Sequence, residues 1–82
     1  MQQNDIQATV TRVLGEVAKV DPAVVARDKR LREDLGLDSL TLIEVAVAAE
    51  DAFGVSLPDE DLERFQTVGD VIDYVRRANV AA

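Results

Sequence analysis

The sequence contains no cysteine and no histidine, and these two absences exclude much of enzyme chemistry. Without cysteine there is no disulfide, no thiolate nucleophile and no zinc site built from cysteines. Without histidine there is no Ser-His-Asp triad, no imidazole base and no histidine-ligated metal. Acidic residues number 16 against 9 basic ones, which gives a formal net charge of −7. A nucleic-acid partner is not expected, because phosphates require a basic surface.

Long apolar runs are also missing. The longest one, residues 45–49, is far too short to cross a membrane, and no targeting segment is visible. We therefore expect a cytoplasmic protein without a membrane span. The length of 82 residues suits one small domain, residues 1–82, in which a deep enclosed active site is not expected.

Hydrophobic periodicity predicts three main helices and one short helix, with no strand pattern. The main helices are expected at about residues 5–19, 39–53 and 68–77, and the short one within residues 56–65. The pair Asp21-Pro22 is expected to end the first helix. Residues 21–38 then form an unusually long connection. The predicted fold class is all-α, a small four-helix bundle with a long first loop.

The helix expected at residues 39–53 carries apolar side chains on two faces. One face is a normal core stripe of Leu42, Val45, Ala46, Ala49 and Phe53. The other holds Leu40, Ile43 and Val47, with Glu44 and Asp51 among them. An apolar patch bordered by carboxylates indicates a partner surface. A small bundle that wraps this helix on both sides would give the same pattern, so periodicity leaves both interpretations open.

Charge is unevenly distributed along the chain. Residues 33–63 include ten acids and no base, and four bases, Arg27, Lys29, Arg30 and Arg32, precede them. A run of acids is usual on a solvated face. It is also suited to electrostatic docking of basic partners.

The segment from Asp34 to Leu40 places the primary hydroxyl of Ser39 at the start of a helix, with Asp38 as the expected N-cap. Helix N-termini favour phosphate, because their N–H groups are unpaired and carry partial positive charge. The chain offers no histidine to activate Ser39, so a reaction there needs a second protein. An ordinary capping serine remains the alternative for this tripeptide alone.

From about Asp34 to Val75 the sequence resembles the acyl carrier proteins, and more loosely over the first helix. The resemblance rests on Asp38-Ser39-Leu40, Glu44, Phe53, Leu57-Pro58-Asp59-Glu60 and Thr67-Val68. It implies a four-helix bundle that is a carrier rather than an enzyme, with covalent 4′-phosphopantetheine taken from coenzyme A. Within the family it is most similar to discrete actinobacterial type II fatty acid synthase carriers, and Thr41 fits their hydroxyl residue.

The resemblance also implies residue roles. Ser39 matches the attachment residue, and Asp38 matches the acid that helps to hold magnesium while a phosphopantetheinyl transferase works. The partner-binding residues are expected to be Leu40, Ile43, Glu44, Val47 and Asp51. The acyl pocket is expected to be lined by Ala49, Phe53, Leu57, Leu62, Phe65, Val71 and Ile72. No catalytic residue and no resident metal are expected.

The expected function is that of a monomeric carrier, which holds growing acyl chains as thioesters on the Ser39 arm and delivers them to fatty acid synthesis enzymes with basic docking patches. A carrier for polyketide, siderophore or other specialised acyl or aminoacyl assembly is the alternative. The loop sequence Lys29-Arg30-Leu31-Arg32 keeps it open, since the family usually has phenylalanine at the Leu31 position and fewer bases. An unmodified adaptor would give the Ser39 hydroxyl no role.

Overall fold

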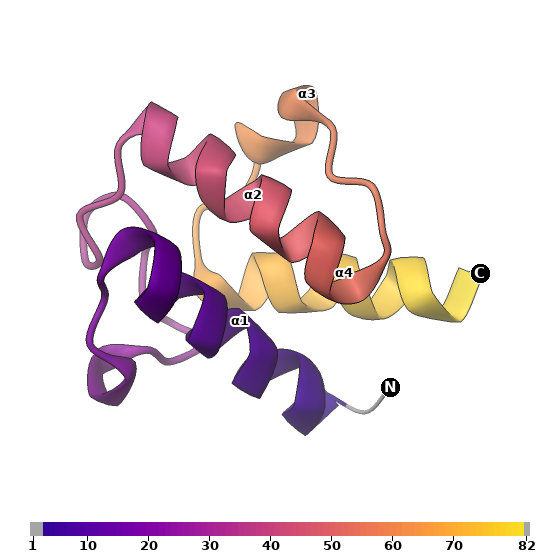
Figure 1. The fold of residues 1–82 in the computed structure, drawn as a ribbon, viewed down its shortest axis with the longest axis horizontal. Coiled ribbons are helices and arrows are strands. Elements are labelled where there is room, and N and C mark those ends of the chain that lie inside the picture. The colour runs from indigo at the N-terminus through magenta and orange to yellow at the C-terminus, as the bar shows by residue number, and fades with distance from the viewer. Residues whose placement is uncertain (1–2, 82) are drawn as a thin grey trace.

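The structure is a computed structural model that describes residues 3–81. Its elements are α1 (Gln3–Ala18), the 3-10 turn η1 (Pro22–Val24), α2 (Ser39–Phe53), α3 (Asp59–Leu62) and α4 (Val68–Ala81) (Figure 1). The described residues form no strand, and the predicted all-α fold with three main helices and one short helix is confirmed. The predicted bounds of α2 are also right, whereas α4 continues beyond its predicted end and α3 is a single turn.

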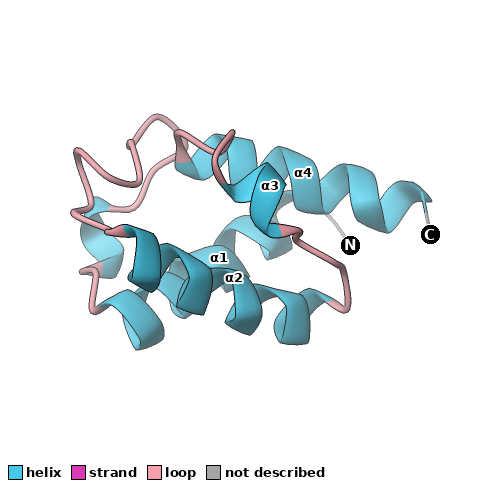
Figure 2. Cartoon of the chain, turned by 90° about the horizontal axis from the view of Figure 1, so that it is seen from above, coloured by secondary structure: helices cyan, strands magenta, loops and turns pink. Residues whose placement is uncertain are grey.

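The three long helices pack around a shared core. α1 contacts both α2 and α4, and α3 contacts α2. The long loop between α1 and α2 lies at the end of the bundle where α2 and α4 begin (Figure 2). Fully buried large side chains come from α1, the long loop and α4: Ile6, Leu14, Leu31, Val68, Ile72 and Val75. Burying a side chain of this kind stabilises the fold by roughly 1.5–3 kcal/mol.

The end of α1 differs from the prediction. The helix stops at Ala18, and Lys19 adopts a left-handed conformation with φ 60°. The N–H of Val20 then donates to the carbonyl of Leu14 at 3.3 Å. The helix therefore ends one residue before the predicted end at about residue 19. Asp21-Pro22 does not itself end α1 but begins η1, with the Asp21 side chain as its cap.

Backbone hydrogen bonds tie the long loop to the start of α4. The Leu31 N–H donates to the Gln66 carbonyl at 2.8 Å, and the Val68 N–H donates to the Lys29 carbonyl at 3.0 Å. Between these bonds, Arg30 and Thr67 form an isolated β-bridge. The loop is thus held by long-range bonds as well as by burial of Leu31, which fixes the point from which the chain enters α2.

Arg27 adds a side-chain clamp to this attachment. One of its guanidinium nitrogens, Nη2, donates to the Asp73 carboxylate on α4 at 3.0 Å. Its carbonyl accepts the Gly69 N–H at 2.9 Å, and a Cβ on Gly69 would lie 3.1 Å from the same oxygen. A side chain at position 69 would therefore crowd the loop, and the Arg27 carbonyl would have to move by a few tenths of an ångström.

Candidate functional site

Asp38 is the N-cap of α2, as predicted. Its backbone is extended, and its Oδ1 accepts the Thr41 N–H at 2.8 Å. This hydrogen bond is the main reason why the pKa of the Asp38 carboxyl lies below its ordinary value, and the charge of Arg32 makes a smaller contribution. The carboxylate beside Ser39 is therefore ionised at neutral pH.

Ser39 is the first residue of α2, and its side chain is exposed. Asp38 provides the cap of α2. The alternative that Ser39 is an ordinary capping serine is therefore wrong. Among the described residues, no hydrogen bond involves the Ser39 hydroxyl. The structure thus leaves a primary hydroxyl in solvent at a helix N-terminus, without a role in holding the fold.

A small hollow lies directly beside Ser39. Its volume is about 140 Å³, and its lining combines apolar side chains with one base and one acid: Arg32, Ser39, Leu42, Ile43, Leu62 and Glu63. The hollow therefore joins the end of the long loop, the first turns of α2 and the end of α3. A group attached to Ser39 would begin at its edge.

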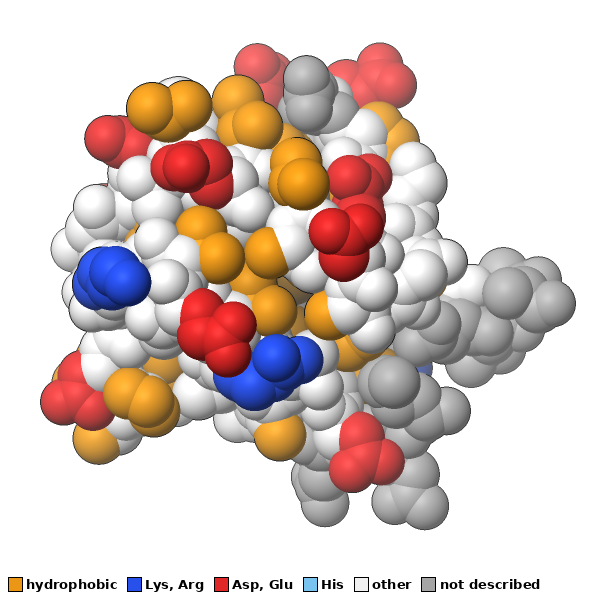
Figure 3. Space-filling view, viewed as in Figure 1, with side chains coloured by type: hydrophobic (Ala, Val, Ile, Leu, Met, Phe, Trp, Pro, Cys, Tyr) orange, Lys and Arg blue, Asp and Glu red, His pale blue; other side chains and the backbone are white. Residues whose placement is uncertain are grey.

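The outer face of α2 is an exposed apolar patch with an acidic border. Leu40, Ile43 and Val47 are 68%, 42% and 53% exposed, and Glu44 and Asp51 are also exposed. Figure 3 shows hydrophobic side chains between acidic ones over the part of this face where Figure 1 draws α2. The bundle therefore does not wrap α2 on both sides, although partner binding by these residues stays a prediction.

All residues predicted to line an acyl pocket are buried in one hydrophobic cluster. They come from α2, α3, α4 and the connections between them: Ala49, Phe53, Leu57, Leu62, Phe65, Val71 and Ile72. Glu50 helps to form this region, since its Oε2 accepts the Leu57 N–H at 2.8 Å. The structure thus brings the predicted residues together, and their contact with an acyl chain remains a prediction.

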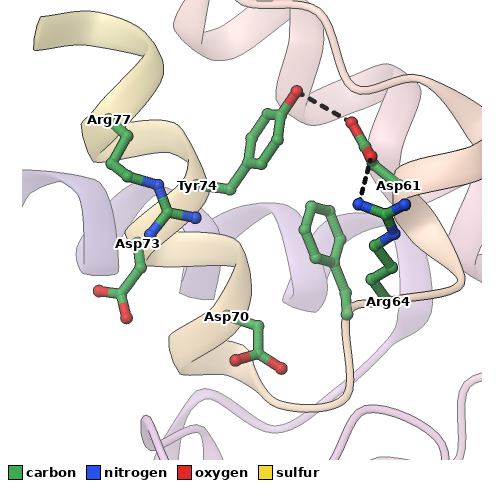
Figure 4. A pocket seen from close by; sticks show the side chains of 7 residues that line it. Asp61, Arg64, Asp70, Asp73, Tyr74 and Arg77 are labelled. Atoms are coloured by element: carbon green, nitrogen blue, oxygen red, sulfur yellow. Dashed lines mark hydrogen bonds and ion pairs between the residues drawn. The ribbon is translucent and has the colours of Figure 1, made fainter.

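A second hollow, of about 290 Å³, lies between the end of α3 and α4 (Figure 4). The Tyr74 hydroxyl points toward Asp61 and donates to its carboxylate at 3.2 Å, and the Tyr74 and Phe65 rings meet edge to face. Burial is the main reason why the pKa of Tyr74 is raised. Two other lining acids serve the fold, because Asp70 caps α4 and Asp73 binds Arg27.

Sequence reasoning did not single out the pair of Tyr74 and Asp61. The two residues lie on different helices, and no local pattern in the sequence links them. Ser39 does not line this second hollow. The pair links α3 to α4 by one hydrogen bond and supplies no nucleophile or base near the predicted attachment residue.

The acidic stretch divides into paired and unpaired carboxylates. Arg30 forms ion pairs with Glu33 at 2.8 Å and with Asp34 at 3.3 Å. Glu44 and Asp51, in contrast, form no ion pair with any residue whose side chain the structure describes. Within that same part of the chain, no group of acidic residues is arranged to hold a metal ion. The outer face of α2 thus carries two of the carboxylates of this stretch that have no ion pair with the described side chains.

Comparison with known proteins identifies this arrangement. The family described as "Phosphopantetheine attachment site" matches residues 8–75. The chain is 38% identical to an acyl carrier protein of Acidothermus cellulolyticus, over all of this chain and 98% of that protein. The chain belongs to the acyl carrier proteins. The expected family is therefore confirmed, and its members are carriers rather than catalytic enzymes.

Other relatives of this carrier differ in length. It is 41% identical to an acyl carrier protein of Rhodococcus erythropolis, over 92% of this chain and 82% of that protein. It is 40% identical to the meromycolate extension acyl carrier protein of Mycobacterium tuberculosis, over 92% of this chain. The chain spans 65% of the length of that relative.

None of the helices within residues 3–81 has the length and apolar character that crossing a membrane requires.

Proposed function

We propose that Ser39 is the attachment residue for 4′-phosphopantetheine and that the chain carries growing acyl groups as thioesters on this arm. The observation that carries the proposal is the exposed Ser39 hydroxyl at the start of α2, next to a helix cap that Asp38 supplies. The arm brings the thiol, which explains how a chain without cysteine can hold a thioester.

Attachment joins Ser39 Oγ to phosphorus while the adenosine bisphosphate part of coenzyme A leaves. The proton of the hydroxyl goes to a base on the phosphopantetheinyl transferase, because this chain has no histidine to accept it. Asp38 is the residue of this chain that would help to hold a magnesium ion during the step, because its carboxylate is ionised and lies next to Ser39. The ion, when bound, would neutralise negative charge on the phosphates of coenzyme A.

Delivery of the acyl group depends on the outer face of α2. Leu40, Ile43 and Val47 provide apolar contact, and Glu44 and Asp51 attract basic patches on fatty acid synthesis enzymes. An exposed patch of this kind can bind several partners in turn. We infer that the carrier works as a monomer in the cytoplasm. The relatives named acyl carrier protein and meromycolate extension acyl carrier protein support fatty acid synthesis as the pathway.

The chain offers a matched pair of variants to test the attachment residue, since its two serines are Ser39 and Ser56 and both are exposed. Incubation with a phosphopantetheinyl transferase and coenzyme A should increase the intact mass of the wild-type chain by one phosphopantetheine group. Ser56→Ala should gain the same mass, whereas Ser39→Ala should gain none. Circular dichroism should show both variants folded, because Asp38 retains the helix cap. Labelling of Ser39→Ala would refute the assignment.

A further inference from the structure

Arg32 differs from its basic neighbours in the long loop. Arg27 is bound to Asp73 on α4, and Arg30 is bound to Glu33 and Asp34. Arg32, in contrast, forms no ion pair within 4.0 Å with any residue whose side chain the structure describes. Its side chain is exposed and lines the hollow beside Ser39.

The lining of this hollow contains one charged residue of each sign. Arg32 is its single base and Glu63 its single acid, and the remaining residues are Ser39 and apolar side chains. Arg32 also lies close enough to the start of α2 for its charge to act on Asp38. A positive charge therefore stands near the Ser39 hydroxyl without a bound counter-charge.

We propose that Arg32 binds the phosphodiester of the arm attached to Ser39 and so positions the first part of the arm along the edge of the hollow. This inference rests on the proposed attachment at Ser39. A phosphodiester bears a negative charge at neutral pH, and the planar guanidinium group matches two phosphate oxygens at once. Glu63, the acid of the same lining, repels this group, so Arg32 is the charged lining residue that attracts the phosphate.

The functional consequence is a restricted starting direction for the arm. Without a cation nearby, the phosphate would remain hydrated, and the arm would leave Ser39 in many directions. With Arg32 engaged, the arm passes over Leu42, Ile43 and Leu62, which are the apolar side chains of the hollow. Arg32 is thus a positioning residue for the carrier and has no part in the chemistry of attachment.

Nuclear magnetic resonance of the apo and modified protein tests this contact. Modification should shift the Nε–H signal of Arg32. In modified Arg32→Gln, the phosphorus-31 signal should be displaced from its wild-type position, with the largest difference at low salt, because salt screens an exposed pair. Arg64→Gln is the matched control, since it removes the same charge from a side chain that is 82% exposed and does not line the hollow. Its phosphorus signal should match wild type.

A second variant separates charge from structure. Arg32→Lys keeps the charge but lacks the planar fork, so its phosphorus signal should move part of the way back to wild type. Intact mass should first show that every variant carries the group. Modified wild type and Arg32→Gln with identical phosphorus signals, and an Arg32 signal unchanged by modification, would overturn the role of Arg32 while leaving attachment standing. Absence of any mass increase in the wild-type chain would instead overturn the attachment itself.

Discussion

The inner and outer faces of α2 carry similar apolar side chains, but those of the inner face are buried and those of the outer face are exposed to solvent. On the inner face Leu42 is 4% exposed and packs in the core, whereas on the outer face Leu40, two residues earlier, is 68% exposed. Val45 and Val47 form a second such pair, at 8% and 53%. Burial in the core therefore explains why the inner positions are apolar. The fold gives no reason for apolar residues at the outer positions.

This difference favours the outer face of α2 as the proposed partner-binding surface. Exposed apolar side chains gain nothing from the fold, and contiguous patches of them usually mark interaction sites. Glu44 and Asp51 lie on the same outer face and form no ion pair with the described side chains, whereas Asp38, Asp70 and Asp73 are used in caps and an ion pair. The outer face is thus the part of α2 that can change its contacts without changing the fold.

The same substitution on the two faces should give the largest contrast. Leu42→Ala should lower the free energy of unfolding by about 2–5 kcal/mol, because it leaves a cavity in the core. Leu40→Ala should change it by about 0.5 kcal/mol or less, as surface substitutions usually do. Urea denaturation followed by circular dichroism measures both. Equal losses in the two variants would mean that Leu40 is not the free surface residue that the structure describes.

Charge reversal on the outer face should affect partner binding and leave stability nearly unchanged. Glu44→Lys should slow association with a phosphopantetheinyl transferase several-fold at low salt, with a smaller effect at high salt. Glu16→Lys on α1 is the control, because it makes the same change in net charge at an exposed residue outside α2. Stopped-flow or surface-binding rates measure the effect. If both variants slowed association equally, the attraction would come from net charge and not from the outer face.

The smallest effect is expected at the start of α2, where Asp38 is the N-cap. Since folding lowers the pKa of Asp38, its contribution to stability is present above the ordinary value of 3.8 and is lost as pH falls through the lower folded value. Asp38→Asn keeps a capping oxygen without the charge, so its melting temperature at neutral pH should exceed that of Asp38→Ala.

Thermal melts from neutral pH to below 3.8 measure this contribution. The wild-type midpoint should fall in acid more steeply than that of Asp38→Asn. A remaining acid dependence is expected in Asp38→Asn, because the pKa of Asp34 is also lowered, chiefly by its hydrogen bond from the Arg30 N–H. Parallel curves for wild type and Asp38→Asn would show that the Asp38 charge does not support the cap.

Local signals made part of this structure predictable from sequence. Asp38 and Gly54 mark the two ends of α2, and the structure uses both, with Gly54 in the left-handed conformation. Thr67 and Asp70, which are three residues apart, form a reciprocal cap at the start of α4. Each of these features depends on residues close together in the chain, so a single sequence is sufficient to find them.

Long-range contacts account for what the sequence did not predict. The bonds that hold Leu31 and Lys29 against the start of α4 join residues far apart in the chain, and no periodicity reveals them. Whether Leu40 and Val47 are buried or exposed likewise depends on which elements cover α2, and the sequence pattern does not show this. The place of Arg32 beside Ser39 follows from the same loop attachment, and a run of bases in the sequence does not distinguish it from Arg30.

Fragment-ion mass spectrometry of the modified wild-type chain tests attachment at Ser39 most directly. Trypsin should release residues 33–64 as one peptide, because no base lies between Arg32 and Arg64, and this peptide contains Ser39, Thr41 and Ser56. The fragments should place a single phosphopantetheine group on Ser39. Fragments that placed the group on Thr41 or Ser56, or an unmodified peptide from a chain exposed to active transferase and coenzyme A, would contradict the account.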